Sequence, residues 1–126
     1  MTNRNDVRGV YNQITSKFPP VAGVANGALV LQDQAFEGMD LETFQKVVKP
    51  KIDGTVFLSE LFEENTLDFF IAFSSVVATL GNSGQSAYSA ANSFCKALIN
   101  QRRERGLAGS VIDREYHTFC LSIGSY

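Results

Sequence analysis

The chain alternates short apolar runs with longer segments of helical periodicity, and this alternation restricts the folds open to it. The run LDFFIAFSS, residues 67–75, is short, apolar and aromatic, and it is the strongest strand pattern in the chain. Residues 21–31 open with a small-residue apolar run like that of a buried parallel strand, and residues 108–113 form a last short strand. Apolar residues at helical spacing precede each strand, in residues 3–17, 39–62 and 85–105. This α-β-α-β-α-β order predicts an α/β fold with a parallel sheet and right-handed crossovers.

Proline, glycine and asparagine residues predict where these elements end. Pro19 follows the first helix, and Asn26-Gly27 should break the first strand. Gly106 is a suitable C-cap for the third helix, whose last turn is rich in arginine. Pro50 lies inside the second helical pattern, so we expect a kink or an irregular turn near Lys51.

Composition and charge are those of an ordinary globular protein. The 126 residues suffice for one modest domain, with 44% hydrophobic and 19% charged residues. A net charge of -2 gives no electrostatic reason to expect a nucleic acid or an anionic membrane as partner. No apolar run approaches the ~20 residues of a membrane span, and the polar N-terminus lacks the apolar core of a signal peptide. We therefore expect a cytoplasmic protein with no membrane and no nucleic-acid partner.

The cysteines give no indication of a metal site. Cys95 and Cys120 form no metal-like spacing with the lone His117. Reduced thiols, as in the cytosol, are the expected state, and we predict no bound metal.

The stretch QSAYSAANSFCKAL, residues 85–98, places two polar side chains in a helix of very small residues. Tyr88 and Asn92 are four residues apart, so they lie on one helical face. Their small neighbours would let another backbone or a flat ligand come close. A purely structural interpretation is also open, in which Tyr88 is a core residue whose hydroxyl finds a partner by chance.

The position of these residues in the predicted sheet favours a functional interpretation. Ligands of parallel α/β sheets bind at the carboxyl ends of the strands. Asn26-Gly27-Ala28 ends the first predicted strand, Ser74-Ser75 ends the second, and the helix of Tyr88 begins just beyond it. The sequence therefore gathers its polar motifs at one edge of the sheet.

Tyr88 could act as a general acid that gives its proton to a carbonyl oxygen while hydride arrives at carbon. A free phenol, with a pKa of ~10, is too weak an acid for this near neutrality, but a nearby cation favours the phenolate. A serine could hold the carbonyl oxygen, and Ser75 lies thirteen residues before Tyr88. Lys96 is two helical turns beyond the tyrosine and too far along the axis, which leaves Lys51 as the candidate cation.

These motifs resemble those of the short-chain dehydrogenase/reductase superfamily, whose members mostly carry lysine four residues after the tyrosine. In the ketoreductase domains of polyketide synthases and animal-type fatty acid synthases, asparagine takes that place and the lysine lies in a preceding P-K-x-x-G motif. The chain is similar to this second pattern, and most of all to fungal, highly reducing polyketide synthases, over residues 2–113. The matching motifs are Pro50-Lys51-Ile52-Asp53-Gly54, Phe73-Ser74-Ser75, and G-x-x-G-Q-x-x-Y-x-x-x-N from Gly81 to Asn92.

The resemblance implies a role for each motif residue. Lys51 would tune Tyr88 and order a proton relay, Asn92 would hold the relay water, and Ser75 would orient the substrate carbonyl. Asn26, Gly27 and Ala28 would line the ribose side of the nicotinamide. The implied reaction is the NADPH-dependent reduction of a 3-ketoacyl chain on an acyl carrier protein to a 3-hydroxyacyl chain, within the rest of a polyketide synthase.

The resemblance also implies that part of the family's domain lies outside this sequence. A dinucleotide-binding fold needs a Gly-rich turn for the pyrophosphate, and no G-x-G-x-x-G turn is present in the 126 residues. We therefore expect a partial Rossmann-like doubly wound sheet, with strands corresponding to 4, 5 and 6 of the family's order and flanking helices. Residues 1–113 would be a truncated ketoreductase domain and residues 114–126 a tail that departs from the family.

Two functions follow from this division. The first is a part of an NADPH-dependent ketoreductase that turns over no ketone by itself, because the cofactor half is absent. The alternative is a non-catalytic remnant, or a fragment that docks on a larger synthase through the unpaired edge of its first strand. At the residue level, Lys51 could still be an ordinary solvated lysine and Asn26-Gly27 only a turn.

Overall fold

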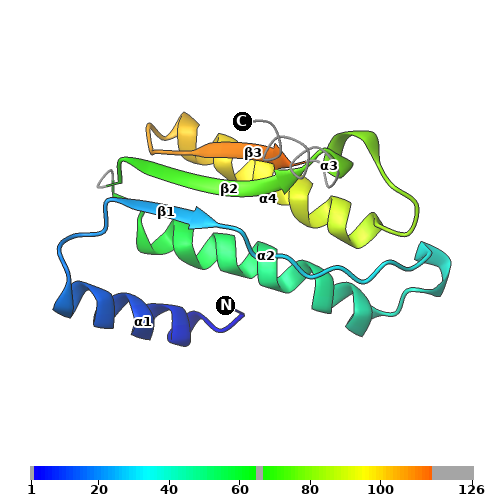
Figure 1. The fold of residues 1–126 in the computed structure, drawn as a ribbon, viewed down its shortest axis with the longest axis horizontal. Coiled ribbons are helices and arrows are strands. Elements are labelled where there is room, and N and C mark those ends of the chain that lie inside the picture. The colour runs from blue at the N-terminus through cyan, green and yellow to red at the C-terminus, as the bar shows by residue number, and fades with distance from the viewer. Residues whose placement is uncertain (1, 65–66, 115–126) are drawn as a thin grey trace, which may run out of the picture.

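The computed structural model, which describes residues 2–64 and 67–114, contains a three-stranded parallel sheet with helices packed against it (Figure 1). The strands β1 (Gly23–Asn26), β2 (Phe69–Ser75) and β3 (Ser110–Arg114) lie side by side in that order. Asn26 pairs with Ala72, and Ser75 pairs with Arg114. The predicted α/β fold with a parallel sheet is confirmed, and all three strands end at the same edge.

The helices alternate with the strands as the sequence predicts. Within the described residues, no helix has the length and apolarity needed to cross a membrane. The helical elements are α1 (Arg4–Lys17), the 3-10 turn η1 (Phe36–Gly38), α2 (Leu41–Leu61), the short α3 (Val77–Leu80) and α4 (Ser86–Glu104). The turn η1 and helix α3 fall in segments where the sequence analysis assigned no helix or strand.

Local side-chain and backbone bonds set the helix ends. The Asp40 carboxylate accepts a 2.7 Å bond from the backbone N–H of Thr43, which caps the start of α2. Gly106 has φ of 74°, in the left-handed region that favours glycine after a helix. The predicted C-cap is thus confirmed. The first strand ends at Asn26, which confirms the predicted break at Asn26-Gly27.

Helix α2 runs unbroken through Pro50, so the expected irregular turn near Lys51 is wrong. Proline in a helix removes one backbone bond and costs about 3 kcal/mol. Burial on both sides of the proline outweighs this cost, since Val47 and Val48 precede it and Thr55 and Lys51 follow it in the protein interior. Lys51 therefore lies on a regular helix, which fixes the direction of its side chain.

Two apolar clusters join α2, α4 and the sheet. One contains Phe70 and Ala72 of β2 with Cys95 and Ile99 of α4. The other contains Val47 and Val48 of α2 with Ala87, Tyr88 and Ala91 of α4. The small alanines let the two helices approach closely, and this contact brings the Tyr88 ring against α2.

The opposite face of the sheet carries exposed apolar side chains in the described part of the chain. Phe69 is 46% exposed and Ile112 is 42% exposed, whereas Phe70 is fully buried. A Cβ atom at Gly23 would overlap the Phe69 ring, so glycine makes room for that ring on the neighbouring strand. The sheet is therefore packed on the α2–α4 side and open on the other.

Candidate active site

The polar residues predicted as a site lie at the carboxyl edge of the sheet or on the two helices behind it. Asn26 is the last residue of β1 and Ser75 the last residue of β2. Helix α2 carries Lys51, and α4 carries Tyr88 and Asn92. The Lys51 Nζ atom lies 5.8 Å from the centre of the Tyr88 ring, so the two helices bring this pair together.

Lys51 is a buried lysine with a specific partner, so its interpretation as a solvated lysine is wrong. It is 5% exposed, and its Nζ donates a 2.6 Å bond to the backbone carbonyl of Phe73, two residues before Ser75. Burial lowers the pKa of the Lys51 ammonium from its ordinary 10.5; the Cys95 thiol opposes this shift and the Arg114 charge adds to it. The ammonium thus lies between the end of β2 and the Tyr88 ring.

Tyr88 and Asn92 lie on the face of α4 that meets α2. Tyr88 is 7% exposed and belongs to the α2–α4 cluster, as the structural interpretation predicted. The Asn92 amide Nδ2 donates a 2.8 Å bond to the backbone carbonyl of Tyr88. Its Oδ1 atom is buried and has no hydrogen-bond partner among the described residues. A buried amide oxygen is normally paired, so Asn92 Oδ1 is an open acceptor beside Tyr88.

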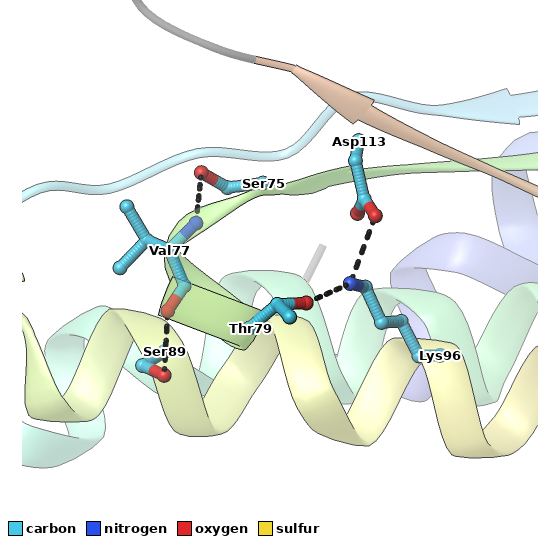
Figure 2. Close-up of polar contacts among 6 residues, drawn as sticks. All are labelled: Ser75, Val77, Thr79, Ser89, Lys96 and Asp113. Carbon is cyan, nitrogen blue, oxygen red and sulfur yellow. Dashed lines mark hydrogen bonds and ion pairs between the residues drawn. The ribbon is translucent and has the colours of Figure 1, made fainter. Parts of the chain in front are cut away.

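The Ser75 hydroxyl is oriented by the turn that follows β2. Its Oγ accepts a 3.2 Å bond from the backbone N–H of Val77 (Figure 2). The N–H uses an oxygen lone pair, so the hydroxyl hydrogen of Ser75 stays free to donate to another group. A hydroxyl with a free hydrogen can donate to a carbonyl oxygen.

Asn26 fixes the turn at the end of β1 with both ends of its side chain. Its Oδ1 accepts a 3.1 Å bond from the backbone N–H of Ala28, and its Nδ2 donates a 2.8 Å bond to Thr55 Oγ1. The first bond is the local turn contact typical of asparagine. The turn interpretation of Asn26-Gly27 thus describes a real feature, and the Asn26 side chain is already engaged.

Thr55 links Asn26 of β1 to Lys51 of α2, and no motif in the sequence pointed to it. It is fully buried, and its hydroxyl donates a 2.6 Å bond to the backbone carbonyl of Lys51 while it accepts from Asn26. The Cys95 Sγ atom lies 3.4 Å from the same oxygen. The available signal was its position four residues after Lys51, on the same face of the helix.

Lys96 takes no part in this cluster, as its distance along the helix predicted. Its Nζ atom lies 3.1 Å from Thr79 Oγ1 and 2.9 Å from Asp113 Oδ2 (Figure 2). It therefore joins α3 and β3 rather than approaching Tyr88.

A parallel α/β sheet with this serine at its carboxyl edge, and with this lysine, tyrosine and asparagine on the helices behind it, is the arrangement of a Rossmann-like domain of the short-chain dehydrogenase/reductase type. The profile of the KR domain family matches residues 1–118. The chain belongs to this family, the ketoreductase domains of polyketide synthases.

Curated relatives are large fungal synthases. The polyketide synthase-nonribosomal peptide synthetase TwmB of Talaromyces wortmannii is 52% identical over 113 residues, which are 90% of this chain and 4% of the relative. The hybrid PKS-NRPS synthetase lepA of Aspergillus flavus is 51% identical over 113 residues, again 90% of this chain and 3% of the relative. The chain thus spans a few per cent of the length of these relatives.

Solved ketoreductases share the fold. The ketoreductase from the first module of phoslactomycin biosynthesis in a Streptomyces species superposes with a TM-score of 0.83 at 29% identity, over 89% of this chain and 26% of that chain. A ketoreductase domain from the bacillaene assembly line gives a TM-score of 0.82 at 35% identity, over 89% of this chain and 28% of that chain.

Proposed function

We propose that this chain supplies the catalytic part of an NADPH-dependent ketoreductase that reduces a carrier-bound 3-ketoacyl thioester to the 3-hydroxyacyl product. The observation that carries the proposal is the buried Lys51 ammonium, 5.8 Å from the Tyr88 ring and bonded to the strand that ends in Ser75. An acid, a cation and a hydroxyl donor at the carboxyl edge of a parallel sheet are what the reduction of a ketone to an alcohol requires.

Tyr88 is the proposed general acid, and Lys51 is its electrostatic partner. When the phenol gives its proton to the carbonyl oxygen of the substrate, a phenolate is left behind. The Lys51 ammonium stabilises that phenolate, and its effect is strong because the site is shielded from water. The bond from Lys51 to the Phe73 carbonyl keeps the cation in place throughout.

Ser75 adds a hydrogen-bond donor to the proposed catalytic group, and Asn92 adds an acceptor. The free hydrogen of the Ser75 hydroxyl is proposed to bind the substrate carbonyl oxygen and hold it toward Tyr88. The unpaired Asn92 Oδ1 is proposed to accept from a water that returns a proton to Tyr88 after each turnover.

The cofactor implied by the family is NADPH, which supplies the hydride when bound. The Lys51 ammonium beside Tyr88, with the Asn92 acceptor open for the relay water, fits a site that receives such a hydride donor. The Asn26 side chain is used inside the protein, so the backbone of Gly27 and Ala28 is the part of this turn that would line the ribose. The sequence holds no Gly-rich turn for the pyrophosphate, and we propose that these 126 residues alone bind NADPH weakly and reduce no ketone.

The test is to replace the 113 matching residues of the Talaromyces wortmannii relative with the matching residues of this chain and to assay the chimera. We expect saturable NADPH oxidation with a 3-ketoacyl thioester, and a loss of about a thousandfold in kcat for Tyr88→Phe. The chain assayed alone serves as the comparison.

Two outcomes would contradict the proposal. A folded but inactive chimera would favour the non-catalytic alternative, in which the chain is a remnant or docks on a synthase through the β1 edge. Equal activity of the Tyr88→Phe chimera would show that the tyrosine is not the acid.

A further inference from the structure

Helix α3 follows Ser75 directly and is too short to be stable by itself. It has four residues, Val77–Leu80, none of them buried, and its N-cap makes no side-chain bond. An isolated helix of this length does not persist in water, because its nucleation is unfavourable. Its backbone nevertheless donates the Val77 N–H bond that orients the Ser75 hydroxyl. The orientation of Ser75 therefore depends on what holds α3.

Side chains of α4 hold α3 at both of its ends (Figure 2). The Ser89 hydroxyl donates a 3.2 Å bond to the backbone carbonyl of Val77. Two turns further along, the Lys96 ammonium donates a 3.1 Å bond to Thr79 Oγ1. Ser89 and Lys96 are seven residues apart, so they lie on one face of α4. The first of them is the neighbour of Tyr88 in the chain.

Lys96 also reaches the third strand. Its Nζ lies 2.9 Å from the carboxylate of Asp113, the residue that pairs with Ser74 in the sheet. The Lys96 side chain is 26% exposed and that of Asp113 is 39% exposed, so the pair is partly shielded from water. The Lys46–Glu42 pair on α2 has the same 2.9 Å separation, but its side chains are 59% and 77% exposed and it joins two residues of a single helix.

We propose that Lys96 is a positioning residue for Ser75. By binding Thr79 and Asp113 together it fastens α3 and β3 to α4, and α3 in turn keeps the Ser75 hydroxyl in register with Tyr88. The effect on turnover rests on the proposed ketoreductase function, whereas the effect on α3 does not. Methionine in place of Lys96 keeps most of the aliphatic stem and removes the charge and the donors.

The first experiment measures amide hydrogen exchange by NMR in the full 126-residue chain, for the wild type, Lys96→Met and the control Lys46→Met. We expect the amides of Val77, Leu80 and Gly81 to exchange about fivefold faster in Lys96→Met, with the amides of β2 and of the middle of α4 unchanged. The control should leave the α3 amides as in the wild type. An unchanged α3, or an equal increase throughout the protein, overturns the proposal.

The second experiment measures kinetics in the chimera described above. We expect Lys96→Met to lower kcat about tenfold with little change in KM, because the substrate binds but its carbonyl is poorly oriented. Lys96→Arg, which can donate to both partners, should recover most of the loss. Unchanged kcat together with faster α3 exchange would refute the catalytic role, and an inactive wild-type chimera would refute the ketoreductase function while the exchange result still decides the role in holding α3.

Discussion

Lys51 and Cys95 are two buried titratable groups whose pKa values shift in opposite directions from the same main cause. Burial disfavours the charged form of each, so it lowers the pKa of the ammonium and raises that of the thiol. Thr55 lies between them, bonded to the Lys51 carbonyl and in contact with the thiol. The interior behind the site is therefore a place where charge is costly, and Lys51 is kept there at the expense of stability.

The pH dependence of stability should show this cost. The pKa of Lys51 is lower in the folded chain than its ordinary 10.5, so the folded chain loses the proton first as pH rises. The unfolded state then binds more protons, and Lys51 makes stability rise with pH in the window below 10.5. In urea unfolding, the free energy of unfolding of Lys51→Met should exceed that of the wild type most at neutral pH. The difference should shrink as pH approaches 10.5. A stability difference between the two proteins that grows with pH would contradict a lowered pKa for Lys51.

The Cys95 thiol should be unreactive in the folded chain. It is 1% exposed, and burial raises its pKa above the ordinary 9.0, so little thiolate is present or accessible. In a Cys120→Ser background, in which Cys95 is the only thiol, a thiol reagent should react at least about a hundredfold more slowly than with the urea-unfolded chain. Equal rates in the two states would show that α4 opens readily at this point.

At the scale of single residues, the sequence motifs identified the candidate site residues but not the groups that these residues contact. Tyr88, Asn92, Ser75 and Lys51 were picked out by motif and spacing, and the structure brings Lys51 and Tyr88 into contact. The bond from Lys51 to the Phe73 carbonyl joins α2 to β2, and no local pattern encodes such a contact. Their catalytic roles stay predictions until the chimera is assayed.

At the scale of secondary-structure elements, Arg102 joins α4 to the end of α2. It is 2% exposed, and its guanidinium donates to the backbone carbonyls of Ser59, Phe62 and Ala108. The same group lies 4.2 Å from the centre of the Phe70 ring. Carbonyl groups at a helix end need partners, and here one side chain supplies them for α2.

Replacing Arg102 should lower the stability of the fold far more than replacing the exposed Arg103 beside it. We expect Arg102→Met to lower the free energy of unfolding by about 3 kcal/mol, because it leaves buried carbonyls unpaired. Arg103→Met, in the same turn but exposed, should change stability by less than about 0.5 kcal/mol. Chemical denaturation of the two variants measures both values, and similar values would show that the carbonyls find other partners.

The predicted boundaries of helices agree with the structure where a single capping residue determines them. Gly106 was predicted to close the third helix, and it follows α4 with φ of 74°. The second helix was predicted from residue 39, and α2 has Asp40 as its N-cap. The continuity of α2 through Pro50 was predicted wrongly, because burial on both sides of the proline is a tertiary effect. Helix α3 was missed, because it is a single short turn whose contacts, the bonds from Ser89 and Lys96 and the packing of Val77 on the α2–α4 cluster, are tertiary.

At the scale of the whole molecule, β1 and β3 are the two edges of the described sheet, and the face away from α2 is apolar. Unpaired strand edges favour association with other chains, and a charge on the edge opposes it. Ala25→Lys, at an exposed position of β1, should reduce concentration-dependent association in sedimentation velocity. Phe36→Lys adds the same charge at a 71% exposed position outside the sheet and should have little effect. An equal reduction by both variants would indicate non-specific hydrophobic association instead.

The overall topology was predictable because a strict alternation of helix and strand permits few arrangements. The parallel pairing follows from that alternation, and the strand order agrees with the order that the family resemblance implied. A partial sheet was expected, but the apolar residues of β2 alone do not show which of its faces is left uncovered.

The central position of β2 also bears on how the chain folds as it is synthesised. The residues of β1 leave the ribosome before their hydrogen-bonding partners Phe69–Ala72, which follow only after the whole of α2. Within residues 2–114, β1 therefore has no strand to pair with until β2 has been made, and β3 can then add to the other edge of β2. A polypeptide ending at residue 64 should unfold without cooperativity, whereas one ending at residue 106 should already resist proteolysis. The pairing of these three strands during synthesis thus waits for the middle one, and until then the segment that holds β1 and α2 stays accessible to chaperones and proteases.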